Sequence, residues 1–156
     1  MTTRRQFLVL TCGAMAAGAA HAQLPPDIGA KRKAAAAEAL RRVTGGAELR
    51  TGKVKLEIPP LIDNGNAVPL TVTVDSPMTE KDHVKAIHVL TERNPQPNVV
   101  AVHLGPRSGR ANITTRVRLA DTQTVTAIAQ MSDGSFWADH VDVVVTLSAC
   151  LEDGLI

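Results

Sequence analysis

Cys150, near the C-terminus, is the side chain best suited to covalent chemistry. The 156-residue sequence holds two cysteines, and Cys12 lies in an N-terminal segment that we expect to be removed. Paired cysteines are the rule in exported proteins, so a single remaining thiol is unusual there. A thiolate acts as a nucleophile and as an attachment point. The sequence therefore predicts that Cys150 takes part in covalent chemistry; the alternative is a free cysteine without a role.

Histidines and arginines offer two further hypotheses. His88 and His103 fall in strand-like segments and are expected to share a sheet face, as a metal site would require. The spacing of His83 and His140 does not match that of metal ligands. The alternative is that the histidines are ordinary polar residues on sheet faces or loops, and we expect no metal or cofactor. A group of arginines could bind a small anion, with a solvated strand face as the alternative. These are Arg107, Arg110, Arg116 and Arg118.

Motifs of common catalytic sites are absent from the sequence. It has no G-x-S-x-G, no phosphate-binding glycine loop, no H-E-x-x-H and no C-x-x-C. Gly134-Ser135 stands in the wrong context for a nucleophile elbow. The sequence therefore offers few signatures of an enzyme. An independent hydrolase or metalloenzyme stays open as a hypothesis that needs a constellation of residues not visible here.

The N-terminus has the pattern of a twin-arginine signal peptide. Arg4 and Arg5 are followed by Gln-Phe-Leu, an apolar stretch and the small-residue site Ala20-His21-Ala22. The apolar stretch is too short for a membrane span, which needs about 20 residues. We expect cleavage after Ala22, export of the folded protein to the periplasm, and no association with a membrane.

Charge and aromatic content narrow the class of partner. Lys and Arg number 17 against 15 Asp and Glu, and removing Arg4 and Arg5 would balance the two signs. A neutral chain lacks the basic surface that nucleic acid binding needs. The only aromatic residues beyond the signal are Phe136 and Trp137, so the core must be built from Val, Ile, Leu and Ala.

One helix and about seven strands are expected. Residues 30–43 combine strong helix formers, with Asp27 as the expected N-cap and Gly45-Gly46 as the stop. Beyond Arg50, apolar and polar residues alternate with period two between Pro, Gly and Asn-Asp breakers. The expected strands are 54–58, 70–74, 84–92, 99–105, 113–119, 124–132 and 136–147.

This pattern predicts a mainly β fold, an immunoglobulin-like antiparallel β-sandwich with one N-terminal helix. The chain is long enough for one domain with a sizeable core. The expected organisation is a signal peptide (1–22), a helix and linker (23–48), the sandwich (49–147) and a cysteine-bearing tail (148–156).

Between about Pro60 and Cys150 the chain resembles the SoxY family, the sulfur-carrier subunits of bacterial thiosulfate-oxidising systems. Six stretches carry the resemblance: Asp63-Asn64-Gly65-Asn66-Ala67-Val68-Pro69, Asp75-Ser76-Pro77-Met78, Arg93-Asn94-Pro95-Gln96-Pro97, Thr115-Arg116-Val117-Arg118-Leu119-Ala120, Thr122-Gln123-Thr124-Val125 and Ala129-Gln130-Met131-Ser132-Asp133-Gly134.

The resemblance implies a periplasmic carrier that is not itself a catalyst. Cys150 corresponds to the carrier cysteine, which takes thiosulfate or another sulfur species covalently. The adduct is then presented to haem, hydrolytic and molybdenum enzymes of the periplasm. The carrier has an immunoglobulin-like sandwich and forms a heterodimer with a SoxZ-like subunit, with which it is exported.

The tail differs from the family pattern. Family members typically end in Gly-Gly-Cys-Gly-Gly, whereas here Ser148-Ala149 precede and Leu151-Glu152-Asp153 follow the cysteine. Side chains stiffen the arm, and two carboxylates beside the sulfur disfavour a thiolate and an anionic substrate. An alternative therefore stays open: a divergent SoxY-like scaffold or binding protein that keeps the partner interface without carrier chemistry.

Overall fold

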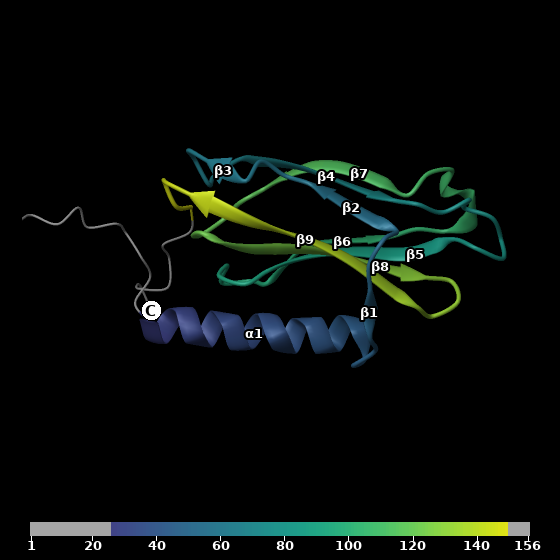
Figure 1. Cartoon of the computed structure of the whole chain (residues 1–156), viewed down its shortest axis with the longest axis horizontal. Coiled ribbons are helices and arrows are strands. Elements are labelled where there is room, and N and C mark those ends of the chain that lie inside the picture. The colour runs from purple at the N-terminus through teal and green to yellow at the C-terminus, as the bar shows by residue number, and fades with distance from the viewer. Residues whose placement is uncertain (1–25, 150–156) are drawn as a thin grey trace, which may run out of the picture.

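Two β-sheets and one helix make up the part of the chain that the computed structural model describes, residues 26–149 (Figure 1). Helix α1 spans Pro26–Thr44 and precedes all the strands. The strands are β1 (Leu49–Arg50), β2 (Val54–Glu57), β3 (Leu61–Ile62), β4 (Val68–Val74), β5 (Val84–Thr91), β6 (Asn98–His103), β7 (Asn112–Val117), β8 (Gln123–Met131) and β9 (Phe136–Val145), with a short 3-10 helix at Pro106–Ser108.

The strands form a two-layer sandwich. The larger sheet has the order β1-β9-β8-β5-β6, with β3 pairing to β9, and the smaller sheet has the order β2-β4-β7. The long strands pair antiparallel within each sheet. The expected fold class, a mainly β sandwich with one N-terminal helix, is confirmed.

The core lies between the two sheets and is aliphatic. Val72 of the smaller sheet and Ile87, Val89 and Val125 of the larger sheet are fully buried, at 0% exposure. Burying one such side chain contributes roughly 1.5–3 kcal/mol. Period-two alternation in β4 supplies Val72 and in β8 supplies Val125, because successive side chains point to opposite faces of a strand, whereas β5, which supplies Ile87 and Val89, is buried on both faces.

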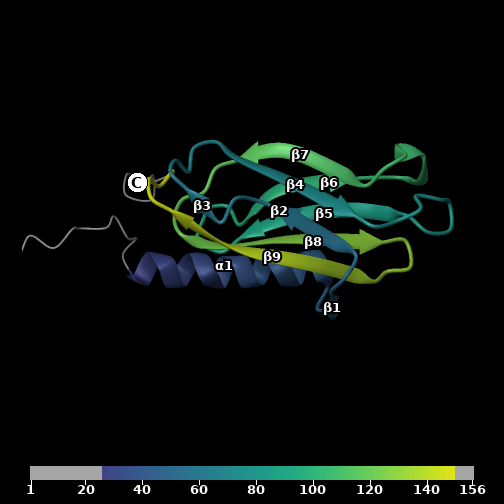
Figure 2. The ribbon, with the colours of Figure 1, turned by 45° about the horizontal axis from the view of Figure 1, so that its top comes forward.

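Helix α1 covers the outer face of the larger sheet (Figure 2). Its Ala39 packs in one cluster with Leu90, Ile128 and Phe136 of the sheet. The start of the helix differs from expectation. The helix begins at Pro26, so Asp27 lies in its first turn and not at the N-cap, because proline suits the first helical position. The helix stops as expected, with Gly45 at a φ of 63°.

All seven expected strands are present, and two short strands were missed. β1 and β3 have two residues each and pair parallel with β9. Two residues cannot show a period, so no sequence pattern marks them. Within residues 26–149, no helix is both long and apolar enough to span a bilayer.

Candidate functional site

The site is built from the residues that lead into Cys150, because Cys150 itself lies outside the described residues 26–149. We call Thr146–Ala149 the stem. It follows β9 directly, and Ala149 is the residue bonded to Cys150. Whatever fixes the stem therefore fixes the point at which the cysteine-bearing tail joins the sandwich.

Backbone hydrogen bonds hold the stem against two loops. The Ala149 N–H donates to the carbonyl oxygen of Leu119 (3.0 Å), and the Gly65 N–H donates to that of Leu147 (2.8 Å). The two loops are joined in turn, since the Leu119 N–H donates to the Gly65 carbonyl (2.8 Å). Ala149 is only 2% exposed. The last described residue before Cys150 is therefore buried and hydrogen-bonded to the sandwich.

Gly65 is required by this close approach and not by its backbone angle. A Cβ added at Gly65 would lie 2.3 Å from the Leu119 carbonyl oxygen and 3.1 Å from the Ala149 nitrogen. Real Cβ contacts are not that short, so any side chain would push the two loops and the stem apart. The neighbouring Asn64 shapes the loop by accepting the N–H of Asn66 on its side chain (2.9 Å).

A buried polar cluster around Asn94 is hydrogen-bonded to the loop that contains Leu119. Asn94 Oδ1 accepts the Ala120 N–H (2.9 Å) and Gln123 Nε2–H (2.9 Å), while Asn94 Nδ2 donates to the Arg118 carbonyl (2.7 Å). Asn94 and Gln123 are each 5% exposed. Buried polar groups are costly when unpaired, so this cluster fixes the loop that receives the stem.

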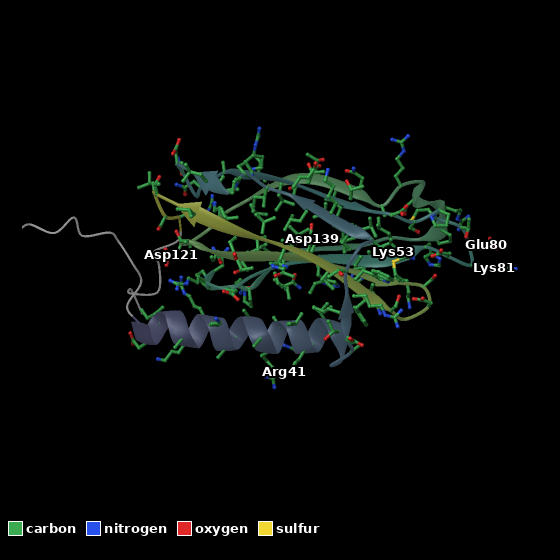
Figure 3. The ribbon with its side chains drawn as sticks, viewed as in Figure 1. Arg41, Lys53, Glu80, Lys81, Asp121 and Asp139 are labelled. Carbon is green, nitrogen blue, oxygen red and sulfur yellow. The ribbon has the colours of Figure 1, made fainter. Side chains whose placement is uncertain are left out.

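An ion pair ties the same cluster to the loop after β5. Arg93 Nη1 contacts Asp121 Oδ2 at 2.9 Å, and the Arg93 N–H donates to Gln123 Oε1 (2.7 Å). Arg32 of α1 donates to the Arg93 carbonyl (2.7 Å). Asp121 lies near the end of β9 in Figure 3. Helix, loops and stem therefore meet at one end of the sandwich, which we call the tail end.

Exposed apolar side chains lie in the stem and next to it. Among the described residues, the large hydrophobic side chains that are mostly exposed are Leu61 (62%), Val144 (49%) and Leu147 (59%). Leu61 and Val144 are register partners in the β3–β9 pair. Apolar groups clustered beside a candidate site suit contact with another protein.

Most of the stretches that resemble the SoxY family converge on the tail end, which the sequence alone did not reveal. Asp63–Pro69 supplies Gly65, Thr115–Ala120 supplies Leu119, and Arg93–Pro97 and Thr122–Val125 supply the polar cluster. Asp75–Met78 and Ala129–Gly134 lie at the opposite end, where β4 and β8 finish.

The histidines do not form a metal centre in the described residues. His88 and His103 share one face, as expected, with ring centroids 6.2 Å apart. Desolvation, and secondly the nearby His103, lower the pKa of His88 below its usual 6.5. His83 precedes β5 and contacts the Thr79 carbonyl through Nδ1. Across residues 26–149, no group of three or more His, Cys, Asp or Glu side chains is placed to hold a metal ion.

The arginines and Ser135 keep to solvated or structural positions. Ser135 Oγ donates to Asp133 Oδ1 (2.6 Å) and accepts the Trp137 indole N–H (3.0 Å), which closes the β8–β9 turn. The four arginines are all exposed, which fits the solvated strand face that was the alternative to an anion site. They are Arg107, Arg110, Arg116 and Arg118.

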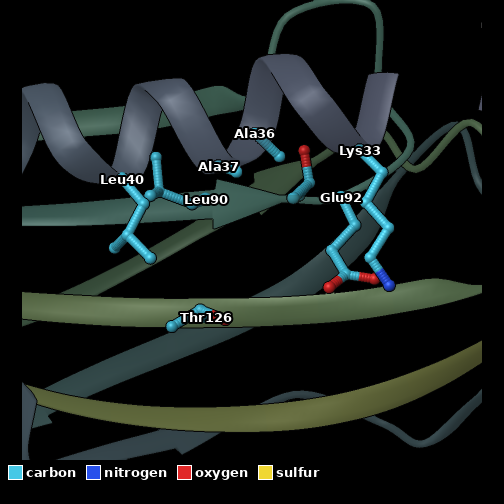
Figure 4. Close-up of a pocket in the computed structure, with 8 residues that line it drawn as sticks. Lys33, Ala36, Ala37, Leu40, Leu90, Glu92 and Thr126 are labelled. Atoms are coloured by element: carbon cyan, nitrogen blue, oxygen red, sulfur yellow. The ribbon is translucent and has the colours of Figure 1, made fainter. Parts of the chain in front are cut away.

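A small pocket opens between α1 and the end of β5 (Figure 4). It has a volume of about 170 Å³ and is lined mainly by apolar groups, among them Ala36, Leu40 and Leu90. Lys33 and Glu92 stand together at one side of it in Figure 4. The pocket shows that the alanine-rich helix does not fill the whole outer face of the sheet.

Comparison with known proteins gives one family and one fold. A family model described as "Sulfur oxidation protein SoxY" matches residues 40–150. No curated protein matches the chain. Among solved structures, the sulfur carrier protein SoxY from Chlorobium limicola f thiosulfatophilum is 23% identical with a TM-score of 0.61, covering 73% of this chain and 98% of that one.

Superoxide reductases share the same architecture. The enzyme (neelaredoxin) from Ignicoccus hospitalis is 16% identical with a TM-score of 0.56, covering 62% of this chain and 94% of its own. The enzyme from Nanoarchaeum equitans is 11% identical with a TM-score of 0.51, covering 62% and 100%. At these identities the likeness concerns the fold alone.

Proposed function

Because the chain belongs to the SoxY family of sulfur oxidation proteins, we propose that it is a periplasmic carrier that binds thiosulfate-derived sulfur covalently on Cys150. The observation that carries the proposal is the stem. Ala149 is buried and its N–H donates to the Leu119 carbonyl, and four of the six family-like stretches meet around that contact. A carrier needs its attachment point tethered at a defined place on a stable body.

The loading step forms one bond. The Cys150 sulfur joins the outer sulfur of thiosulfate, giving a cysteine S-thiosulfonate, while the thiol proton is released and two electrons pass to a partner enzyme that holds a haem. Hydrolytic and molybdenum enzymes of the same system would then act on the bound sulfur. The carrier supplies the thiol and its position, and partner enzymes supply the redox chemistry.

Export and assembly belong to the same proposal. The twin-arginine signal would deliver a folded protein, which suits a carrier that leaves the cytoplasm already paired with a SoxZ-like subunit. The exposed Leu61, Val144 and Leu147 beside the stem support contact with partner proteins at this end.

Intact mass measurement of the protein purified from the periplasm of thiosulfate-oxidising cells tests the proposal. We expect a reducible mass increase on Cys150 that Cys150→Ser abolishes. Ser148→Ala, which changes a stem residue shortly before Cys150, is the matched control and should load normally. An unmodified thiol in cells whose other carriers are loaded would contradict the proposal.

The acidic tail favours a second candidate, a SoxY-like scaffold without carrier chemistry. Glu152 and Asp153 follow Cys150 closely in the sequence, and negative charge near a thiol disfavours the thiolate. The double change Glu152→Gly and Asp153→Gly separates the two functions. A carrier hindered by these charges should load faster after the change. A scaffold should remain unloaded, and Cys150→Ser should leave thiosulfate oxidation unchanged.

A further inference from the structure

The pocket between α1 and the end of β5, which we call the helix pocket, has room for an aliphatic side chain (Figure 4). Ala36 and Ala37 line it on the helix side, and Leu90 lines it on the sheet side. Its volume of about 170 Å³ exceeds the roughly 150 Å³ of an engineered apolar cavity that takes up benzene. One leucine or isoleucine side chain would therefore fit inside it.

The helix pocket lies at the tail end of the sandwich. The Ala149 N–H donates to the carbonyl of Leu119 (3.0 Å), and the N–H of the next residue, Ala120, donates to Asn94 Oδ1 (2.9 Å). Glu92 lines the pocket and lies two residues before Asn94. Added end to end, these short steps place the rim of the pocket within roughly 20 Å of Ala149.

The segment that follows Cys150 has the length and the composition to occupy the helix pocket. Its sequence is Leu151-Glu152-Asp153-Gly154-Leu155-Ile156, outside the described residues. At roughly 3.3–3.6 Å for each extended residue, the chain from Cys150 to Leu155 spans about 20 Å, which covers the distance to the pocket. Leu155 and Ile156 are aliphatic and gain free energy when they leave water for an apolar site.

Opposite charges favour the same arrangement. Residues 31–33 of α1 are Lys-Arg-Lys, and the last of them lines the helix pocket. Positive charge near the start of a helix opposes the helix dipole, and Asp27 is the acidic residue of the first turn. Glu92 brings one negative charge to the rim, so the balance stays positive. Glu152 and Asp153, in a segment without Lys or Arg, would offset this charge when the segment lies along α1.

We propose that the segment after Cys150 docks on the helix pocket, with Leu155 in the apolar interior and the two carboxylates beside the basic run of α1. Cys150 is then held on both sides, by the buried Ala149 before it and by the docked segment after it. A thiol held in this way presents itself to a reagent or an enzyme less often than one in a free tail. Docking would thus regulate loading of Cys150, and this consequence alone rests on the proposed function.

Alkylation of Cys150 by iodoacetamide in the purified, exported protein measures docking without any sulfur chemistry. Leu155→Ser removes the apolar anchor and changes no charge, so the alkylation rate should rise at least about threefold. Ala37→Leu fills the pocket from the helix side and should raise the rate in the same way. Each rate is divided by the rate of the same variant in denaturant, which corrects for the reactivity of the thiol itself.

Ala35→Leu is the matched control for the pocket-filling variant. Ala35 is exposed on the same helix and does not line the helix pocket, so the alkylation rate should stay at the wild-type value. An alkylation rate that neither Leu155→Ser nor Ala37→Leu raises would overturn the inference. A rate that rises with Ala37→Leu and not with Leu155→Ser would overturn Leu155 as the occupant of the pocket.

Disulfide trapping tests where the segment docks. In protein with Cys150→Ser, the pair Ile156→Cys and Ala37→Cys should form an intramolecular disulfide at least about tenfold faster than the pair Ile156→Cys and Ala35→Cys. Equal trapping rates would overturn the helix pocket as the docking site. If trapping and alkylation behave as expected while wild-type Cys150 takes up no sulfur in cells, the docking inference stands and the proposed function fails.

Discussion

The two ends of the sandwich are built from different kinds of contact. At the tail end, residues far apart in the sequence meet, as Gly65, Leu119 and Ala149 do through buried backbone bonds. At the far end, where Glu80 and Lys81 lie in Figure 3, long-range bonds such as that from Ser132 Oγ to the Lys81 carbonyl (3.2 Å) are present, but the exposed turns themselves are held by bonds between near neighbours. Asp133 with Ser135 and Thr79 with Asp82 are such pairs, and all four bond in exposed turns.

The difference shows which end of the sandwich forms only when distant parts of the chain are correctly packed. A local turn can form without the rest of the fold, because a polar side chain can hydrogen-bond to a backbone group only a few residues away. Long-range contacts need the whole sheet to be in place before they form. The tail end therefore forms only in the complete fold. The position of Ala149, to which the tail is attached, is fixed only when the fold is complete.

The largest effect is expected at Asn94. Asn94→Ala would leave the Ala120 N–H, the Arg118 carbonyl and the Gln123 side chain without their buried partner, which should cost about 3 kcal/mol of stability. Thr79→Ala breaks an exposed turn bond at the far end and should cost less than about 0.5 kcal/mol. Urea unfolding of both variants measures the contrast, and equal losses would contradict it.

A somewhat smaller effect is expected at Gly65. Gly65→Ala forces a methyl group onto the Leu119 carbonyl and should lower the free energy of unfolding by about 2 kcal/mol. Gly105→Ala is the matched control, since its Cβ would meet nothing within 4 Å and its φ of −134° suits any residue. Thermal unfolding compares the two. A Gly65→Ala protein as stable as Gly105→Ala would show that the loops can move apart freely.

The smallest effect is expected at Asp133. Hydrogen bonds from the Ser135 side chain, and then from its backbone, lower the pKa of Asp133 below its ordinary 3.8. A lowered pKa in the folded state adds stability above the unfolded value and loses it as pH falls through the folded value. Asp133→Asn should therefore be slightly less stable than wild type near neutral pH, and the gap should close below pH 3.8.

Acid unfolding of wild type and Asp133→Asn between neutral pH and about pH 2 follows that gap. Because Asp133 is exposed, solvent screens the interaction and the gap should remain smaller than the effects at the tail end. A gap that widened on acidification would mean that the carboxylate destabilises the folded turn.

Much of the fold could be predicted from the pattern of single residues. Period-two alternation together with the Pro, Gly and Asn-Asp breakers located the seven long strands, and Gly45-Gly46 located the end of the helix. The pattern did not reveal β1, β3 or the first turn of α1. Two-residue strands have no period, and Pro26 resembles a breaker until a helix is seen to start on it.

The candidate site was predictable only in part. Cys150 stood out as a lone thiol, and its role as the attachment site remains a prediction, as does the periplasmic location. The contacts that fix the stem before Cys150 were not predicted, although Asn94 and Gly65 both lie in stretches that resemble the family. A turn-like Asn-Gly sequence looks the same whether its glycine serves a positive φ or, as here, a close approach.

The sequence by itself determined the strand pattern, the aliphatic core, the lone thiol and the membership in a family, because these depend on residue type and spacing along one dimension. Only the tertiary structure decided which loops meet at the stem and which strands lie at the sheet edges. Those outcomes depend on how the strands pair and how the sheets stack. Strand pairing brings together residues that are far apart in the sequence, and no periodic pattern in the sequence marks them as neighbours.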